Sequence, residues 1–166
     1  MPLLAEAVAR VIGETTIVVA PDLGAVKLAR AYANHLHVPM AFVHKTGLNG
    51  EAVEAHAVIG EVRGRLPLIV DDMLSTGATI DAAVGVLRAA GAVEPMSVVV
   101  THALLVGRAR EILQRLPLAN IVVTDSVSME LPAPPHLDIC SVAPLLATAI
   151  QRNHHDESLA DLRGSA

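Results

Sequence analysis

One stretch of the sequence, Leu68–Thr79, constrains the fold and the chemistry of this chain more than any other. It reads Leu-Ile-Val-Asp-Asp-Met-Leu-Ser-Thr-Gly-Ala-Thr, and helical spacing begins at Ile80. Apolar, β-branched residues lead into two carboxylates and then into small and hydroxylated residues, which predicts a buried strand, an acidic step, a loop and a helix. Open parallel sheets bind their ligands at such carboxyl ends of strands.

The loop of this stretch predicts an anion site. The first N–H groups of a helix have no intrahelical acceptor, and the helix dipole adds positive potential there. A glycine lets the backbone approach a phosphate closely, and two adjacent carboxylates can accept hydrogen bonds from sugar hydroxyls. A sugar phosphate fits both features, and the alternative is that these side chains only cap the loop and the helix. The residues expected to bind the sugar phosphate are Asp71, Asp72, Ser75, Thr76, Gly77, Ala78 and Thr79.

The string Val-Asp-Asp-Met-x-x-Thr-Gly-x-Thr resembles the phosphoribosyl pyrophosphate loop of the type I phosphoribosyltransferases and, more closely, that of the ribose-phosphate diphosphokinases. Further stretches resemble the diphosphokinases: Val19–Gly24, Val43–Lys45, Val100–His102 and Val122–Asp125. The resemblance covers almost the whole chain but only the C-terminal half of those enzymes. It implies binding of ribose 5-phosphate and magnesium in nucleotide biosynthesis, and transfer of diphosphate from ATP.

Two more residues are candidates for this chemistry. Asp22 follows a predicted strand, where a carboxylate suits magnesium, although it could equally cap the next helix. The resemblance implies that Asp22 binds Mg²⁺ and that Lys45 is catalytic, stabilising charge on the transferring group. Gly47 departs from the family, which usually has an arginine there, and Ala78 replaces a common second glycine. Phosphoryl transfer depends on positioning and charge neutralisation, so the missing arginine weighs against catalysis.

Three functions therefore stay open. The first, and the leading hypothesis, is a ribose-phosphate diphosphokinase homologue. The second is a free-standing phosphoribosyltransferase, which transfers the sugar from phosphoribosyl pyrophosphate to a base. The third is a non-catalytic relative that binds sugar phosphate or a full-length partner. Gly47 and the lack of a segment like the family's ATP-binding half favour the third and make ATP the least supported partner.

Alternating strand and helix patterns predict one α/β domain, with a largely parallel sheet flanked by helices on both faces, as in phosphoribosyltransferases. The domain is expected over 1–152, followed by a polar tail over 153–166 that frays. Asn49-Gly50 predicts a turn within an excursion that folds over the site as a lid. Helices are expected over 3–12, 25–36, 77–90, 107–116 and 142–152, and strands over 15–20, 39–45, 58–60, 68–72, 96–101, 120–124 and 137–140.

Composition narrows the classes of partner and location. The net charge is −5, and Tyr32 and Phe42 are the only aromatic residues, which argues against nucleic acid. No apolar run is long enough to span a membrane, and the 52% hydrophobic content predicts a homo-oligomer. One cysteine, Cys140, expected as a buried small hydrophobe, and the lack of a leader pattern predict a cytoplasmic protein. Of the eight histidines only His102, at a predicted strand end, is a candidate to line the site.

Overall fold

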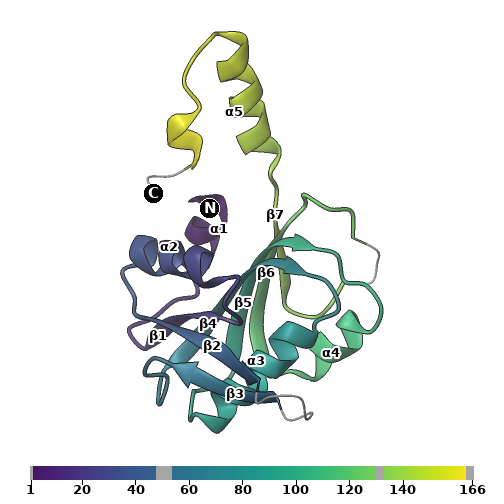
Figure 1. Ribbon diagram of the computed structural model, residues 1–166. Coiled ribbons are helices and arrows are strands. Elements are labelled where there is room, and N and C mark those ends of the chain that lie inside the picture. The colour runs from purple at the N-terminus through teal and green to yellow at the C-terminus, as the bar shows by residue number, and fades with distance from the viewer. Residues whose placement is uncertain (1, 48–53, 130–132, 164–166) are drawn as a thin grey trace.

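The computed structural model describes residues 2–47, 54–129 and 133–163, and it shows alternating strands and helices (Figure 1). The elements are α1 (Pro2–Val8), β1 (Thr16–Ala20), α2 (Val26–Leu36), β2 (Met40–Gly47), β3 (Glu54–Ile59), β4 (Leu66–Leu74), α3 (Ala78–Ala89), β5 (Met96–Ala103), α4 (Ala109–Arg115), β6 (Leu118–Thr124), β7 (Leu137–Cys140), α5 (Ala143–His154) and a 3₁₀ helix, η1 (Ala160–Arg163).

Seven strands form one sheet in the order β3-β2-β1-β4-β5-β6-β7. Every neighbouring pair is parallel except β2 and β3, which form an antiparallel ribbon at one edge. Strands β1 and β4 lie in the middle of the order, and their continuous apolar runs suit strands that are covered on both faces. The predicted class, a largely parallel sheet flanked by helices, is confirmed.

Two hydrophobic clusters cover the two faces of the sheet. Alternate residues of β1 belong to different clusters. Ile17 and Val19 pack toward α3 and α4, whereas Val18 and Ala20 pack toward α1 and α2. Figure 1 shows the same arrangement, with α1 and α2 on one side of the strands and α3 and α4 on the other. The sheet is therefore packed between helices on both faces. The carboxyl ends of its strands carry the polar residues.

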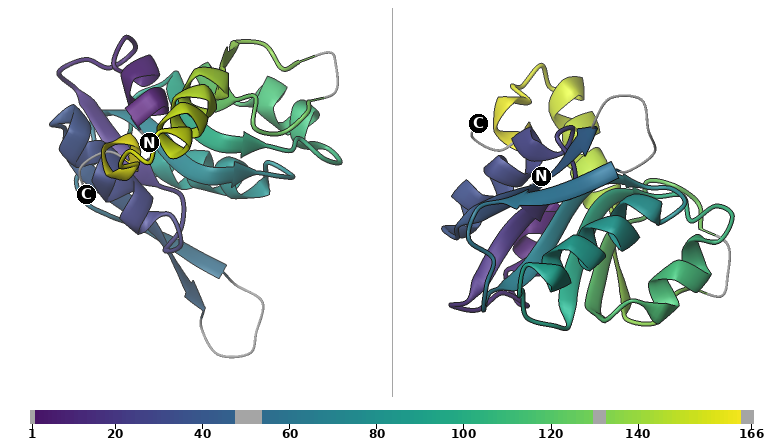
Figure 2. Two further views of the ribbon diagram at one scale, coloured as in Figure 1. Left: turned by 90° about the horizontal axis from the view of Figure 1, so that it is seen from above. Right: turned by 60° about the horizontal axis from the view of Figure 1, so that its bottom comes forward.

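Several element boundaries differ from the sequence-based expectations. Strand β3 begins at Glu54 rather than at residue 58, because it pairs with β2 along a ribbon that extends beyond the body of the sheet (Figure 2). The expected Asn49-Gly50 turn and lid lie outside the described residues. Helix α1 ends at Val8, four residues before its expected end, and α5 continues to His154. Within the expected polar tail, Ala160–Arg163 form the 3₁₀ helix η1.

Helix α5 stands away from the rest of the domain (Figure 1). None of its described residues is buried, and Leu146 and Ile150 are 54% and 70% exposed. Asp125 fixes the start of this helix, because its carboxylate accepts a 2.7 Å hydrogen bond from the Val142 N–H. Cys140 lies in the edge strand β7 and is only partly buried, so the expectation of a buried hydrophobe is wrong. In the described residues, no helix is both long and apolar enough to cross a lipid bilayer.

Candidate functional site

The predicted site residues follow strands that end at one edge of the sheet. Strands β1 and β2 pair in parallel as far as Ala20 and Phe42, so Asp22 and Lys45 both lie beyond that pair in the same direction. Strand β4 is parallel to β1 and β5, and it carries Asp71 to this edge as well. The topology therefore brings these residues, which come from three separate segments of the sequence, to the same end of the strands.

The two aspartates of β4 differ in exposure. Asp71 is partly buried and Asp72 is exposed, and the Asp72 N–H donates a 2.9 Å hydrogen bond to Asp71 Oδ1. Burial raises the pKa of the Asp71 carboxyl from 3.8 to about 6, and the negative charges of Asp22 and Asp72 contribute to the rise. In the described part of the chain none of these three carboxylates forms an ion pair. The edge therefore has uncompensated negative charge, which favours a cation or a ligand rich in hydroxyl groups.

Asp22 caps the turn that leads into α2. Its Oδ1 accepts a 3.1 Å hydrogen bond from the N–H of Ala25, the residue directly before the helix, which has no side-chain cap of its own. This contact is of the kind that the sequence left open beside the metal role. Within the described ranges, no three carboxylate, imidazole or thiol groups are placed to hold a metal ion. A metal at Asp22 would therefore need ligand oxygens and water to complete its coordination.

The loop between β4 and α3 takes a left-handed turn directly before the helix. Gly77 has φ +82° and precedes Ala78, the first residue of α3. A Cβ atom at Gly77 would lie 3.3 Å from Ile112 Cγ2 of α4, so the glycine is needed both for its conformation and for close packing. Ala78 is exposed and has an ordinary negative φ, so its methyl group causes no strain. Thr76 Oγ1 accepts a long, 3.4 Å hydrogen bond from the Ala78 N–H.

Backbone hydrogen bonds from the next segment of the chain hold this loop from behind. The N–H groups of Leu104 and Leu105 donate to the Leu74 carbonyl oxygen, and the Val106 N–H donates to that of Ser75. These contacts tie the start of the loop to the segment between β5 and α4. The start of the loop is therefore held by contacts within the protein.

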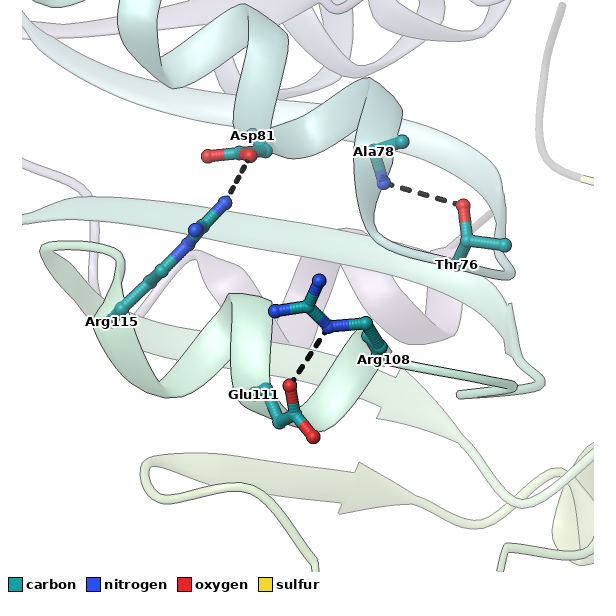
Figure 3. A network of polar contacts seen from close by, with 6 residues as sticks. All are labelled: Thr76, Ala78, Asp81, Arg108, Glu111 and Arg115. Carbon is teal, nitrogen blue, oxygen red and sulfur yellow. Dashed lines mark hydrogen bonds and ion pairs between the residues drawn. The ribbon is translucent and has the colours of Figure 1, made fainter.

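One acidic residue lies in the first turn of α3, where it could repel an anion. Asp81 is neutralised by an ion pair with Arg115, which joins α3 to α4 (Figure 3). Arg108, at the start of α4, pairs with Glu111 on the exposed surface shown in the same view. Because Asp81 is paired, the helix N-terminus keeps its positive potential.

The remaining candidates lie on β2 and β5. Lys45 lies in β2 opposite His56, and its side chain lies outside the described part of the structure. Gly47 is the last residue of β2. His102 lies in β5 opposite Met73, and its Nδ1 is 2.8 Å from Ser126 Oγ. Sequence reasoning missed Ser126, although it directly follows the Val122–Asp125 stretch that resembles the family.

A family comparison matches most of the chain. The profile described as "Phosphoribosyl synthetase-associated domain" matches residues 50–163. The chain belongs to this family. The resemblance expected from the β4–α3 loop is therefore confirmed.

The curated relatives of this family member are ribose-phosphate pyrophosphokinases. The one from Rhodopirellula baltica is 39% identical over 155 residues, which are 92% of this chain and 49% of the relative. The one from Streptomyces avermitilis is 38% identical over 170 residues, 98% of this chain and 51% of the relative. The chain spans about half the length of the curated relatives that it matches.

Solved structures agree with this assignment. The phosphoribosylpyrophosphate synthetase of Mycobacterium smegmatis superposes with a TM-score of 0.79 and 34% identity, over 92% of this chain and 48% of that one. The APRTase of Giardia lamblia superposes with a TM-score of 0.57 and 22% identity, over 73% of this chain and 75% of that one. The second likeness concerns the fold, and it confirms the phosphoribosyltransferase-like architecture.

Proposed function

We propose that this chain is the sugar-phosphate-binding half of a ribose-phosphate pyrophosphokinase, and that it binds ribose 5-phosphate or phosphoribosyl pyrophosphate. One juxtaposition carries the proposal: Asp71 and Asp72, which form no ion pair among the described residues, lie near the end of β4, and this strand leads into a loop with a left-handed Gly77 at a helix N-terminus. The loop suits the 5′-phosphate, and the carboxylates suit the ring hydroxyl groups. The relatives' name supports the sugar, since they are pyrophosphokinases of ribose phosphate.

We further propose that Asp22 is a magnesium ligand at this edge. The three unpaired carboxylates supply the hard oxygen atoms that Mg²⁺ prefers, and their mutual repulsion decreases when a cation binds. Mg²⁺ commonly takes one or two protein carboxylates and completes its shell with phosphate oxygens and water, so a cluster of three protein ligands is not required. Bound magnesium would neutralise charge on the diphosphate of the ligand. Lys45, which follows the β1–β2 pair in the same direction as Asp22, would support that neutralisation.

A calorimetric titration tests the proposal. Ribose 5-phosphate, phosphoribosyl pyrophosphate and ATP are each added to the protein with Mg²⁺. We expect both sugar phosphates to bind and ATP alone to give no heat, because Gly47 supplies no cation for its phosphates. ATP binding, with AMP and phosphoribosyl pyrophosphate formed when ribose 5-phosphate is also present, would assign the complete pyrophosphokinase reaction to this chain. Failure of both sugar phosphates to bind would refute the proposed function.

Asp22→Asn separates the two roles of Asp22. The asparagine Oδ1 can still accept the hydrogen bond from Ala25, but the side chain has lost its charge. We expect unchanged thermal unfolding without magnesium, and about a tenfold smaller gain in phosphoribosyl pyrophosphate affinity on adding Mg²⁺. Asp22→Ala removes the cap as well and should lower the free energy of unfolding by about 1 kcal/mol. An undiminished magnesium effect in Asp22→Asn would leave Asp22 as a cap alone.

A further inference from the structure

The Ser75–Thr79 loop, proposed above to bind the phosphate, is called the phosphate loop. His102 lies on the side of β4 where this loop is anchored. The sheet order places β1, with Asp22, on one side of β4 and β5, with His102, on the other. His102 pairs with Met73, and the residues after it hold the loop through the hydrogen bonds to Leu74 and Ser75. His102 is therefore a neighbour of the phosphate loop rather than of the magnesium side of the site.

Strand alternation also gives His102 the same face of the sheet as Asp71. Asp71 pairs with Val100, and His102 follows Val100 by two residues on β5. Residues at such diagonal positions of neighbouring strands are close enough for long side chains to meet at a shared ligand. A molecule that contacts Asp71 and the loop would thus have His102 beside it.

A hydrogen-bond network after β6 fixes the imidazole. Thr124 Oγ1 donates a 2.6 Å hydrogen bond to the Thr101 carbonyl oxygen, and Ser126 Oγ lies 2.7 Å from Thr124 Oγ1 and 3.2 Å from the same carbonyl. Ser126 Oγ in turn lies 2.8 Å from His102 Nδ1. This network holds one ring nitrogen, while Nε2 has no hydrogen-bond partner among the described residues. The ring is therefore oriented by the protein, with its second nitrogen free for a ligand.

We propose that His102 contacts the phosphate group of the bound sugar through Nε2, and that Ser126 is its positioning residue. The inference rests on the proposed function, because that function assigns the phosphate of the ligand to the Ser75–Thr79 loop. A phosphate accepts hydrogen bonds, so Nε2 carries a proton in the complex. The ring provides this proton in either of two forms. In the imidazolium, Nδ1–H donates to Ser126 Oγ; in the neutral Nε2–H tautomer, the Ser126 hydroxyl donates to Nδ1.

Two substitutions of His102 separate ligand contact from structural support. Asparagine places an amide near the position of Nδ1 and can keep the contact with Ser126, whereas glutamine reaches the position of Nε2. We expect His102→Asn to weaken ribose 5-phosphate binding about tenfold and His102→Gln to weaken it no more than about threefold. The affinity for inorganic phosphate, measured by competition, should fall in each variant by the same factor as the affinity for ribose 5-phosphate. This is expected because the lost contact is to phosphate and not to sugar.

Ser126→Ala tests the positioning role. It should weaken ribose 5-phosphate binding by about threefold and add nothing in the His102→Asn background, where the contact is already lost. Ser128→Ala, at an exposed serine two residues later, is the matched control and should bind normally. In nitrogen-15 spectra of the wild type, ribose 5-phosphate should shift the Nε2 signal of His102.

The outcomes distinguish this inference from the function on which it rests. A wild type that binds no ribose 5-phosphate refutes both. A wild type that binds it, together with His102→Asn at equal affinity, refutes only the role of His102. Equal losses in the asparagine and glutamine variants, with phosphate binding unchanged, would show that the histidine supports the structure and contacts no phosphate.

Discussion

Replacing Asp71 and Asp72 together by asparagine is expected to reduce ribose 5-phosphate affinity by about 100-fold or more. Each carboxylate can accept charge-assisted hydrogen bonds from ring hydroxyl groups, and each such bond contributes about 1.5 to 3 kcal/mol. The amide of asparagine has only one acceptor oxygen and no charge. Calorimetry with and without Mg²⁺ measures the loss, and affinity within about threefold of the wild type would refute the assigned role of the pair.

Asp71→Asn alone should make the free protein more stable at neutral pH. Burial raises the folded-state pKa of Asp71 to about 6, above its unfolded value of 3.8, so folding disfavours the charged form. The penalty is absent below about pH 4, where both states are protonated, grows between pH 4 and 6, and is complete above pH 6. Because Asp71 is only partly buried, we expect asparagine to add about 1 to 2 kcal/mol at pH 8 and almost nothing at pH 4.

Urea unfolding at the two pH values measures this difference. Asp138→Asn is a matched control, because Asp138 is an exposed carboxylate in the edge strand β7, outside the site. It should change neither the stability profile nor the ligand affinity. An Asp71→Asn variant that is less stable than the wild type at pH 8 would mean that the carboxylate stabilises the fold. The stability data would then give no sign that the fold keeps the Asp71 carboxylate, at a cost in free energy of unfolding, for ligand binding.

The fold could be predicted because its signals are local. The apolar runs of β1 and β4, each followed by an acid and then by a helical pattern, specify buried parallel strands with their polar residues at one edge. The helices that cover them follow from the spacing of apolar residues such as Ile80, Val84 and Leu87. Boundaries were less predictable, because β3 extends by pairing with β2, and the sequence of Glu54–Ala57 gives little sign of that partner.

The parts of the site that escaped prediction depend on contacts between distant segments. Asp22 had two equal interpretations, and only the Ala25 hydrogen bond shows the cap. The raised pKa of Asp71 requires burial, which a sequence does not report. Ser126 meets His102 across 24 positions of sequence. The family-like stretch Val122–Asp125 pointed toward that region, but it did not reveal that the next residue holds the imidazole.

Gly77→Ala is expected to damage both the fold and the binding of phosphate. A left-handed backbone costs a residue with a side chain about 1 to 2 kcal/mol, and the new Cβ would also press on Ile112 Cγ2 at 3.3 Å. We therefore expect the free energy of unfolding to fall by about 2 to 3 kcal/mol. If the backbone relaxes to a negative φ, the N–H groups at the start of α3 turn away from the phosphate. Ribose 5-phosphate affinity should then fall by about tenfold or more.

Gly64→Ala is the control for the free-energy cost of a left-handed backbone at alanine. Gly64 also has a left-handed φ, +69°, but nothing lies within 4 Å of an added Cβ, and the residue is remote from the β4–α3 loop. It should lose about 1 kcal/mol of stability and keep full affinity. The excess loss in Gly77→Ala then measures the contact with α4, which holds the loop in its binding conformation. Equal stability losses with normal ribose 5-phosphate binding in both variants would show that phosphate recognition does not depend on this turn.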